Sequence, residues 1–421
     1  MEKDYNSNSR SVKPINPNSS PPSRKGSSWA KEIKGGICAI EGVRANGIKE
    51  GKKGLTIILC EGEASGVFTN NKIKAAPLIL TEKNLSSTGK IRGIIANSGS
   101  ANAFTGKEGY EDAVKMARLL AEEIDSPVEE IGVASTGVIG ERIDFDWVRK
   151  KFGEVFLKIS NTEDASKMAN RGIMTTDTRE KEFAIEYKGV KIGGIAKGSG
   201  MIAPDMATML SFIYTDAKFS SKVLRRSLMR AVDKSFNMLS IDGDTSTNDT
   251  VLLTATGDFS MREEDFQRAL DEVCLELARK IALDGEGATK YIEVRVKGAK
   301  KREDARIAAK SVVNSSLVKT AIFGGDPNWG RIIAALGYSG AEIDGDKISL
   351  FLGNPDEKVK DQNTVILNGE VLRLDEERFR EILSKDKIII EVDLGLGRGE
   401  AISFGCDLSY DYVKINGVYR T

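Results

Sequence analysis

One glycine-rich segment that runs into a threonine could carry chemistry: residues 193–210 read GGIAKGSGMIAPDMATML. The chain contains no histidine, so a nucleophile in this protein would need another general base. An N-terminal threonine supplies its own base, because its α-amine, with a reference pKa of about 7.7–8.0, can accept the hydroxyl proton. Thr208 would gain such an amine if its hydroxyl attacked a strained Ala207 carbonyl and broke the peptide bond between them.

Two other interpretations compete for the same segment. Residues 198–203, GSGMIA, match the GxGxxA pattern of dinucleotide-binding turns. Pro204 falls where the phosphate-binding helix would run, so the dinucleotide interpretation is rejected. A glycine-bulged strand that enters a buried strand is a purely structural interpretation, and residue spacing alone favours it over self-cleavage.

The acidic residues Asp242, Asp244 and Asp249 are candidate ligands for a hard cation, because carboxylates two residues apart can share one ion. They do not follow the twelve-residue calcium-loop pattern, since the glycine is misplaced and the twelfth position from Asp242 is Leu253. Asp-Gly turn chemistry before a strand at 251–255 is the preferred interpretation. No metal site is predicted.

The composition of the whole chain excludes several classes of protein. The 421 residues include 62 Lys plus Arg and 62 Asp plus Glu, and this balance offers no basic excess for a nucleic-acid partner. Apolar stretches such as 55–60 and 388–392 are far shorter than the roughly 20 residues needed to cross a bilayer. The cysteines form no CxxC pair, so neither disulfides nor a zinc site are predicted and a cytoplasmic location fits; they are Cys38, Cys60, Cys274 and Cys406.

The elements that must position these residues alternate between strands and helices. Residues 1–28 are rich in Ser, Asn and Pro and are expected to form a disordered tail. From Trp29 onward, β-branched runs alternate with amphipathic segments, which predicts an α/β protein. Strands are expected at 55–60, 91–96, 291–296 and 387–392, and helices at 110–124, 266–281 and 374–385.

The sequence resembles the glutamate N-acetyltransferase family, also called ornithine acetyltransferases, over nearly everything after the tail. The segment GMIAPDMATML around Thr208 resembles the family's self-processing segment, and further matches occur along the chain in the family's order. They are GVFTNNKIKAAP at 66–77, NSGSANAFTG at 97–106, STGVIG at 135–140, MTTDT at 174–178, SIDGDTSTNDT at 240–250, DGEGATK at 284–290, VKTAIFGGDPNWGR at 318–331 and SFGCDLSYDYVKING at 403–417. So many ordered matches are far more specific than any single short motif.

The resemblance implies that the chain cuts itself between Ala207 and Thr208 and that Thr208 is then the acetyl-accepting nucleophile. Residues 29–207 would form an α chain and residues 208–421 a β chain. The implied fold is a layered α-β-β-α sandwich of mixed sheets, in which both chains belong to one intertwined α/β unit. The two fragments would stay together and pair into an α2β2 heterotetramer.

Further residues match family positions that act on the substrate. Thr136 and Gly137 match the oxyanion-hole pair, whose hydroxyl and N–H stabilise a tetrahedral intermediate; without the resemblance, residues 135–137 would be interpreted as a turn. Ornithine brings two ammonium groups and one carboxylate, so Glu286 would pair with a cation while Lys197 and nearby hydroxyl or amide groups hold the carboxylate. The positions that match the family's substrate-binding residues are Thr175, Lys197, Thr208, Glu286, Asn416 and Thr421.

The implied activity is acetyl transfer from N-acetylornithine to glutamate through an acetyl-threonine intermediate, with release of ornithine, in arginine biosynthesis. Some members of the family, the arginine biosynthesis bifunctional proteins, also use acetyl-CoA, so acetyl-CoA is a candidate co-substrate. No bound cofactor is implied. The chain departs from the family at Asp205, where asparagine is more common, and in its end GVYRT, which contains Thr421.

Two other functions stay open at this point. An amidohydrolase or aminopeptidase could use the same self-generated nucleophile with water as the acceptor. A non-catalytic protein that binds amino acids would not cut itself. Denaturing electrophoresis separates this last class from the others, because an uncleaved chain runs as one band near 45.8 kDa.

Overall fold

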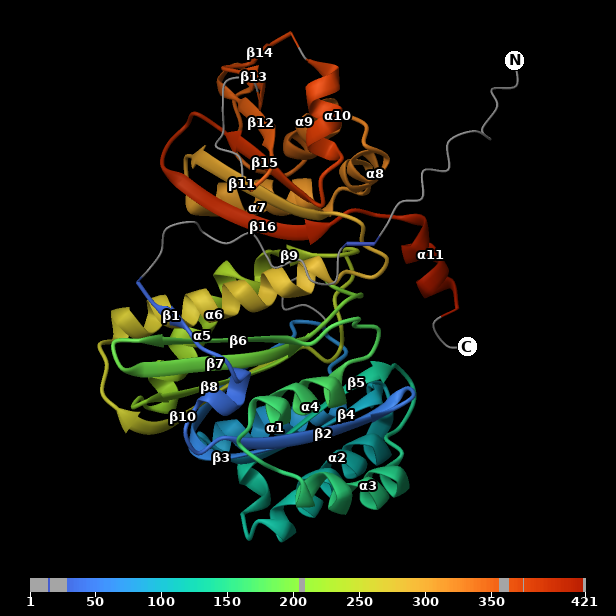
Figure 1. The fold of residues 1–421 in the computed structure, drawn as a ribbon, viewed down its shortest axis with the longest axis vertical. Coiled ribbons are helices and arrows are strands. Elements are labelled where there is room, and N and C mark those ends of the chain that lie inside the picture. Colours follow the sequence, from blue (N-terminus) through green and yellow to red (C-terminus); the bar gives the residue numbers. More distant parts are fainter. Residues whose placement is uncertain (1–13, 16–28, 204–208, 356–362, 374, 419–421) are drawn as a thin grey trace. The chain divides into compact units, whose positions relative to one another are not determined.

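The computed structural model of the chain describes residues 14–15, 29–203, 209–355, 363–373 and 375–418. Most of the tail expected at 1–28 lies outside this range. The chain forms two compact units: Arg24–Asp284, called here the N-terminal unit, and Gly285–Tyr419, called the C-terminal unit (Figure 1). Each unit combines a mixed sheet with helices, so the predicted α/β class is confirmed.

The N-terminal unit is built on a sheet with the strand order β1-β6-β7-β8-β10-β3-β4-β5, and β2 pairs with β3. β8 runs parallel to β10 and β4 runs parallel to β5, while neighbours such as β7 and β8 are antiparallel. The strands are β1 Lys31–Glu32, β2 Arg44–Glu50, β3 Lys53–Phe68, β4 Lys90–Ser100, β5 Ile131–Val138, β6 Lys181–Tyr187, β7 Val190–Lys197, β8 Leu210–Ala217 and β10 Thr250–Phe259.

The sheet forms two layers, and the long strand β3 belongs to both of them. The first part of β3 pairs with β2 and β4, and residues 63–68 pair with β10. Side chains from both parts of the sheet are buried in one hydrophobic core, which includes Ile58, Ile94, Phe212 and Leu252. Burial of these apolar side chains between the layers holds the two parts of the sheet face to face.

Helices cover the outer faces of the two layers. A second core joins the β3 and β4 layer to α2 and α3 through side chains such as Leu55, Ile95, Met116 and Val148. On the other layer, α6 packs on β6 and β7 and α5 packs on α6 (Figure 1). The predicted α-β-β-α sandwich is therefore confirmed. The helices are α1 Ala76–Thr88, α2 Gly106–Glu123, α3 Phe145–Leu157, α4 Glu163–Ile173, α5 Ser221–Lys234 and α6 Glu263–Leu283.

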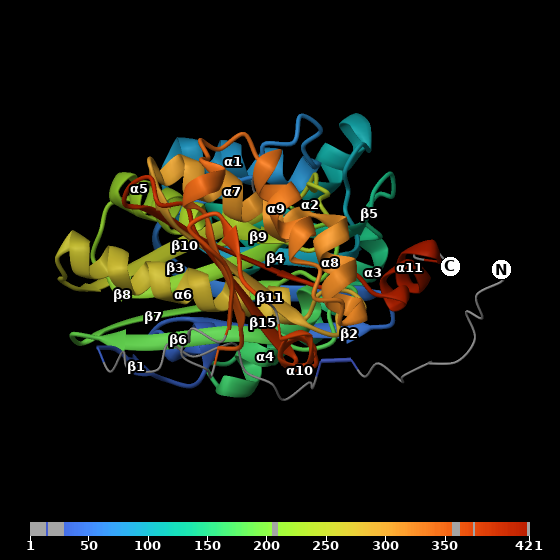
Figure 2. The same cartoon turned by 90° about the horizontal axis from the view of Figure 1, so that it is seen from above.

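The C-terminal unit contains the strand series β14-β13-β12-β15-β11-β16, in which β11 and β15 are parallel. Helix α7 packs on β11 and β16, and α9 packs on α7 (Figure 2). Ile15 belongs to this unit, where it is buried and its N–H donates to the carbonyl of Ala288. The elements are β11 Tyr291–Ala299, α7 Arg302–Asn314, α8 Ser316–Gly324, α9 Trp329–Gly337, β12 Ser349–Gly353, β13 Thr364–Leu367, β14 Glu370–Val371, α10 Glu376–Leu383, β15 Lys387–Asp393, β16 Gly399–Cys406 and α11 Tyr410–Gly417.

The elements expected from sequence patterns are present. The helices expected at 110–124, 266–281 and 374–385 correspond to α2, α6 and α10, and the expected strands lie in β3, β4, β11 and β15. Within the described residues, no helix is long and apolar enough to cross a membrane. Over the same residues, no group of three His, Cys, Asp or Glu side chains is placed to hold a metal ion.

Candidate active site

The expected cleavage point belongs to the connection between two neighbouring strands. β7 ends at Lys197 and β8 begins at Leu210, and these two residues are direct partners in the antiparallel register. Ala207 and Thr208 lie outside the described residues. Residues 198–203 form no strand, so the interpretation of the segment as one glycine-bulged strand is wrong over this stretch. The chain instead leaves the sheet after Lys197 and returns as its antiparallel neighbour.

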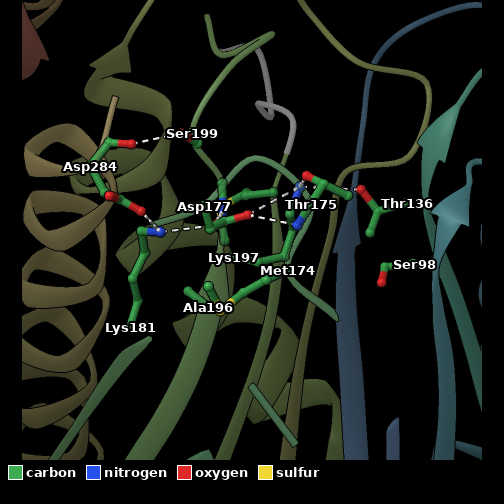
Figure 3. A network of polar contacts seen from close by, with 12 residues as sticks. Ser98, Thr136, Met174, Thr175, Asp177, Lys181, Ala196, Lys197, Ser199 and Asp284 are labelled. Carbon is green, nitrogen blue, oxygen red and sulfur yellow. Dashed lines mark hydrogen bonds and ion pairs between the residues drawn. The ribbon is translucent and has the colours of Figure 1, made fainter. Parts of the chain in front are cut away.

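Three of the expected site residues meet around one buried ammonium group. Lys197 Nζ donates a hydrogen bond to Thr175 Oγ1 at 2.9 Å and another to Thr136 Oγ1 at 3.2 Å (Figure 3). Lys197 is 3% exposed and Thr136 is 4% exposed. A cation held among hydroxyl dipoles and away from bulk water attracts a carboxylate or a developing oxyanion more strongly than a surface lysine does.

Gly137 follows Thr136 near the end of β5, where β5 runs beside β4. Its φ is 138°, and a Cβ atom at this position would lie 2.3 Å from the carbonyl carbon of Gly99. Only glycine permits this close approach of two backbones. The end of β5 therefore carries a threonine hydroxyl, and the glycine that follows it in the chain has a backbone N–H. Hydroxyl and backbone N–H groups are both donor types that serve in oxyanion holes.

Asp177 fixes the two segments that carry Thr175 and Lys197. Its Oδ2 accepts the N–H of Thr175 at 3.0 Å, and its Oδ1 accepts the N–H of Gly198 at 2.7 Å. Its Oδ2 also lies 4.0 Å from Lys197 Nζ. Burial raises the pKa of this carboxyl, but the charges of Lys181 and Lys197 outweigh burial and hold the pKa below its ordinary value. Asp177 is therefore a buried anion that positions the cluster.

A second buried lysine joins this anion to the end of α6. Lys181 Nζ lies 2.7 Å from Asp177 Oδ1 and 2.5 Å from Asp284 Oδ2, and Lys181 is fully buried (Figure 3). The backbone carbonyl of Asp284 accepts the hydroxyl of Ser199 at 2.7 Å. The chain that leaves β7 is thus tied on one side to Asp177 and on the other to the end of α6. Sequence analysis did not single out Asp177, Lys181 or Asp284.

Lys49 is a further lysine that sequence analysis missed. Its Nζ donates to Ser98 Oγ at 2.8 Å and to the carbonyl of Lys52 at 3.2 Å, and it also donates to the carbonyl of Met174, next to Thr175. Its pKa is lowered from 10.5 to about 8, chiefly by burial and also by the positive charge of Lys197, while the negative charge of Asp177 partly offsets these two effects. The site therefore contains a lysine that titrates in mildly alkaline solution.

This lowered pKa predicts a specific pH dependence of stability. Between about 8 and 10.5, the unfolded chain binds a proton at Lys49 that the folded chain does not bind, so raising the pH through this window favours the folded state. We expect wild type to gain stability relative to Lys49→Met across the window, as followed by melting temperature. Lys90→Met, at an exposed position, should behave like wild type. Parallel pH curves for wild type and Lys49→Met would contradict the assignment.

The C-terminal unit brings together two other expected site residues. Asn416, on α11, donates from Nδ2 to Glu286 Oε2 at 2.7 Å, and Glu286 is 6% exposed. The same amide nitrogen also donates to the carbonyl of Tyr412 at 3.1 Å. A buried carboxylate held by an amide is a suitable partner for a substrate ammonium group. Thr421 lies outside the described residues.

Comparison with known proteins gives consistent matches. A glutamate N-acetyltransferase of Methanosarcina acetivorans is 50% identical over 398 residues, which cover 93% of this chain and 100% of that protein. The crystal structure of the arginine biosynthesis bifunctional protein argJ of Bacillus halodurans is 41% identical and covers 50% of this chain and 99% of that chain, with a TM-score of 0.47. The crystal structure of ornithine acetyltransferase of Mycobacterium tuberculosis in complex with ornithine is 30% identical. It covers 42% of this chain and 98% of that chain, with a TM-score of 0.39.

The fold is a mixed α/β fold, and the polar side chains that meet at the site are those of threonine, lysine and aspartate residues. The family model of the ArgJ family matches residues 40–421. The chain belongs to the ArgJ family. It is therefore an acyltransferase of arginine biosynthesis, and the family and enzyme class expected from the sequence motifs are confirmed.

Proposed function

We propose that this acyltransferase moves an acetyl group from N-acetylornithine to glutamate through an ester on Thr208. One observation carries the proposal: Lys197, which binds the hydroxyls of Thr136 and Thr175, is the strand partner of Leu210, two residues after Thr208. The proposed nucleophile thus belongs to the chain segment that joins Lys197 to its own strand partner. The full-length relative at 50% identity bears the name glutamate N-acetyltransferase.

The nucleophile is first released by self-cleavage. The hydroxyl oxygen of Thr208 attacks the carbonyl carbon of Ala207, the C–N bond breaks, and the hydroxyl proton passes to the departing nitrogen. The product is an ester between Ala207 and the Thr208 hydroxyl, together with a free α-amine. Water then hydrolyses the ester, which releases the Ala207 carboxylate and restores the hydroxyl. The Thr208 amine can now serve as the base that the histidine-free chain otherwise lacks.

Acetyl transfer repeats the same chemistry on the substrate. The Thr208 amine takes the hydroxyl proton as the oxygen attacks the acetyl carbonyl of N-acetylornithine, and the proton leaves with the ornithine amine when the C–N bond breaks. The amine of glutamate then attacks the acetyl ester and regenerates the hydroxyl. Thr136 and Gly137 supply hydrogen bonds to the oxyanion of each tetrahedral intermediate, worth roughly 3 kcal/mol per donor.

Each unit, taken by itself, carries charges that suit one group of an amino acid. Lys197 and Thr175 suit the carboxylate of a bound amino acid, because the lysine is buried and already directed by hydroxyls. Glu286, held by Asn416, suits an ammonium group. Thr421 completes the set of substrate-binding residues that we propose from the sequence motifs.

Further properties of the enzyme are part of the same proposal. We expect no bound cofactor, with acetyl-CoA as an alternative acetyl donor to Thr208. Fragments 29–207 and 208–421 would remain together in an α2β2 assembly in the cytoplasm. The four cysteines of the chain are all free thiols, which fits a reducing compartment.

Mass spectrometry of the intact protein after incubation with N-acetylornithine tests the proposal most directly. We expect two fragments, with one added acetyl group on the fragment that begins at Thr208. Parallel initial-rate lines should follow from the covalent intermediate, since ornithine leaves before glutamate is acetylated. An unmodified fragment, or intersecting lines, would overturn the mechanism. Hydrolysis faster than transfer in excess glutamate would instead identify an amidohydrolase.

The oxyanion role of Thr136 gives a separate prediction. Thr136→Val removes a hydroxyl but keeps the shape of the side chain, so we expect kcat to fall about 10²–10³-fold with a smaller change in KM. Thr136→Ser keeps the hydroxyl and should retain most of the rate. Steady-state kinetics with N-acetylornithine and glutamate measures both variants. Equal kcat values for Thr136→Val and wild type would show that the Thr136 hydroxyl does not belong to the oxyanion hole.

A further inference from the structure

The acidic segment at 241–250, called here the clamp loop, contacts the chain on both sides of the expected cleavage point. It joins β9, Leu239–Ser240, to β10. Sequence analysis considered its aspartates as metal ligands and preferred turn chemistry. Asp242 Oδ1 accepts the N–H of Asp244 at 3.3 Å, as the expected turn requires. In addition, Asp242 and Asp249 bind backbone groups of a segment about 40 residues earlier in the chain.

The upstream side of the cleavage point is held by Asp242 and its neighbours. Asp242 Oδ2 accepts the N–H of Met201 at 2.6 Å, and Oδ1 accepts the N–H of Ile202 at 2.8 Å. Ala203 is held by both of its backbone groups: its N–H donates to the carbonyl of Asp244 at 2.8 Å, and its carbonyl accepts the hydroxyl of Thr245 at 2.7 Å. Three consecutive residues before the cleavage segment are therefore fixed by one loop.

The same loop holds the downstream side through Asp249. Asp249 Oδ1 accepts the N–H of Met209 at 2.9 Å, and the N–H of Thr250 donates to the carbonyl of Met209 at 3.1 Å. Asp249 is fully buried, and its Oδ2 has no hydrogen-bond partner among the described residues. Burial raises the pKa of this carboxyl well above its ordinary value. Met209 directly follows Thr208 in the chain, so Asp249 holds the backbone N–H of the residue that comes after the proposed nucleophile.

The upstream anchor also holds an unfavourable backbone conformation. Met201 has a φ of 55°, in the left-handed region that residues with a Cβ atom seldom occupy. Its side chain is 40% exposed, so packing of the side chain does not impose this conformation. The hydrogen bonds of Met201 and Ile202 to Asp242 are the contacts that offset its cost.

We propose that the clamp loop positions the Ala207–Thr208 peptide for self-cleavage, with Asp242 and Asp249 as its positioning residues. The inference rests on the proposed self-cleavage and goes beyond it in naming the groups that make the attack possible. Anchoring Ala203 and Met209 to one loop restricts the five intervening residues, 204–208, and raises the fraction of time that hydroxyl and carbonyl spend in reactive geometry. After cleavage, the same bonds keep both new ends at the site.

A time course of cleavage after cell-free synthesis of the full chain, followed by denaturing electrophoresis, tests the clamp. We expect Asp242→Ala and Asp249→Ala to cleave at least about tenfold more slowly than wild type, because each loses bonds that orient the segment. Asp249→Asn keeps the shape of the side chain and an acceptor oxygen for the N–H of Met209, so it should cleave at nearly the wild-type rate. Asp258→Asn, at an exposed position in β10, the strand that follows the clamp loop, is the control for mutation in this region and should match wild type.

Several outcomes separate the clamp from simpler explanations. Wild-type cleavage rates in both alanine variants would overturn the clamp while leaving self-cleavage standing, whereas an uncleaved wild type would overturn the proposed function and the clamp together. A purely structural role predicts slow cleavage only together with a lowered melting temperature, and slow cleavage in Asp249→Asn as well. The clamp predicts rescue by asparagine, and a KM for N-acetylornithine within about twofold of wild type in the fraction of Asp242→Ala that has cleaved.

Discussion

Replacement of Thr208 by alanine is expected to leave one polypeptide near 45.8 kDa and to abolish acetyl transfer. The same hydroxyl performs both reactions in the proposed mechanism, so a single substitution should remove both. No histidine is present to activate water or another hydroxyl in its place. Denaturing electrophoresis of the purified variant measures cleavage, and release of ornithine from N-acetylornithine measures transfer.

Thr208→Ser provides the matched control, because serine keeps the hydroxyl and can gain the same α-amine. We expect this variant to cut itself and to accept acetyl, at reduced rates. Two fragments from Thr208→Ala would mean that cleavage occurs by another route. One uncut band that still transfers acetyl would mean that the nucleophile lies elsewhere in the chain.

Lys181→Met removes a buried ammonium group, and we expect it to lower the free energy of unfolding more than any other substitution proposed for this protein. Lys181 is fully buried between Asp177 and Asp284, so its loss leaves two buried carboxylates without their closest cation. Breaking a buried ion pair in this way costs about 3–5 kcal/mol. Urea unfolding curves measure the difference. Lys188→Met is the matched control: its lysine also pairs with an aspartate, Asp265, but is 49% exposed, so its loss should cost much less stability than the loss of Lys181.

The pH dependence of the Lys181→Met effect follows from the same charges. In wild type the pKa of Asp177 is lowered, so its contribution to stability is present above the unfolded pKa and is lost as the pH falls through the folded pKa. In the variant, the charge of Lys181 no longer offsets the burial of Asp177, so the pKa of Asp177 lies above its wild-type value and less stability is lost as the pH falls. The difference in the free energy of unfolding between wild type and Lys181→Met should therefore become smaller towards acid pH. A constant difference would mean that the lost stability comes from packing rather than from charge.

Patterns of apolar residues predicted the architecture because they depend on local spacing. The stripe of apolar residues at 266–281 is part of α6, and the β-branched run at 387–392 is part of β15. Motif matches indicated Lys197 and Thr175, and the structure places these two side chains in contact. Such features are recorded in consecutive residues, so one sequence suffices to find them.

The buried charges could not be predicted in the same way. Lysine and aspartate are most often solvated, and nothing near Lys181 in the sequence shows that Asp284, 103 residues away, will lie beside it. The clamp loop was missed for the same reason. The turn expected from its Asp-Gly pair is present, because the N–H of Asp244 donates to Asp242 Oδ1. Nothing in that pair shows that Asp242 and Asp249 will also bind backbone groups about 40 residues earlier in the chain.

The order of strands in the N-terminal unit affects how a chain cut at the proposed site would unfold and refold. β8 and β10, which follow residue 208, lie between β7 and β3, which precede it. The precursor can form this sheet as a single molecule. If the chain is cut as proposed, a protein that unfolds would separate into two polypeptides that must meet again before β8 and β10 can return to their places in the sheet. Recovery would then depend on protein concentration, so the proposed cleavage would make unfolding effectively irreversible in dilute solution.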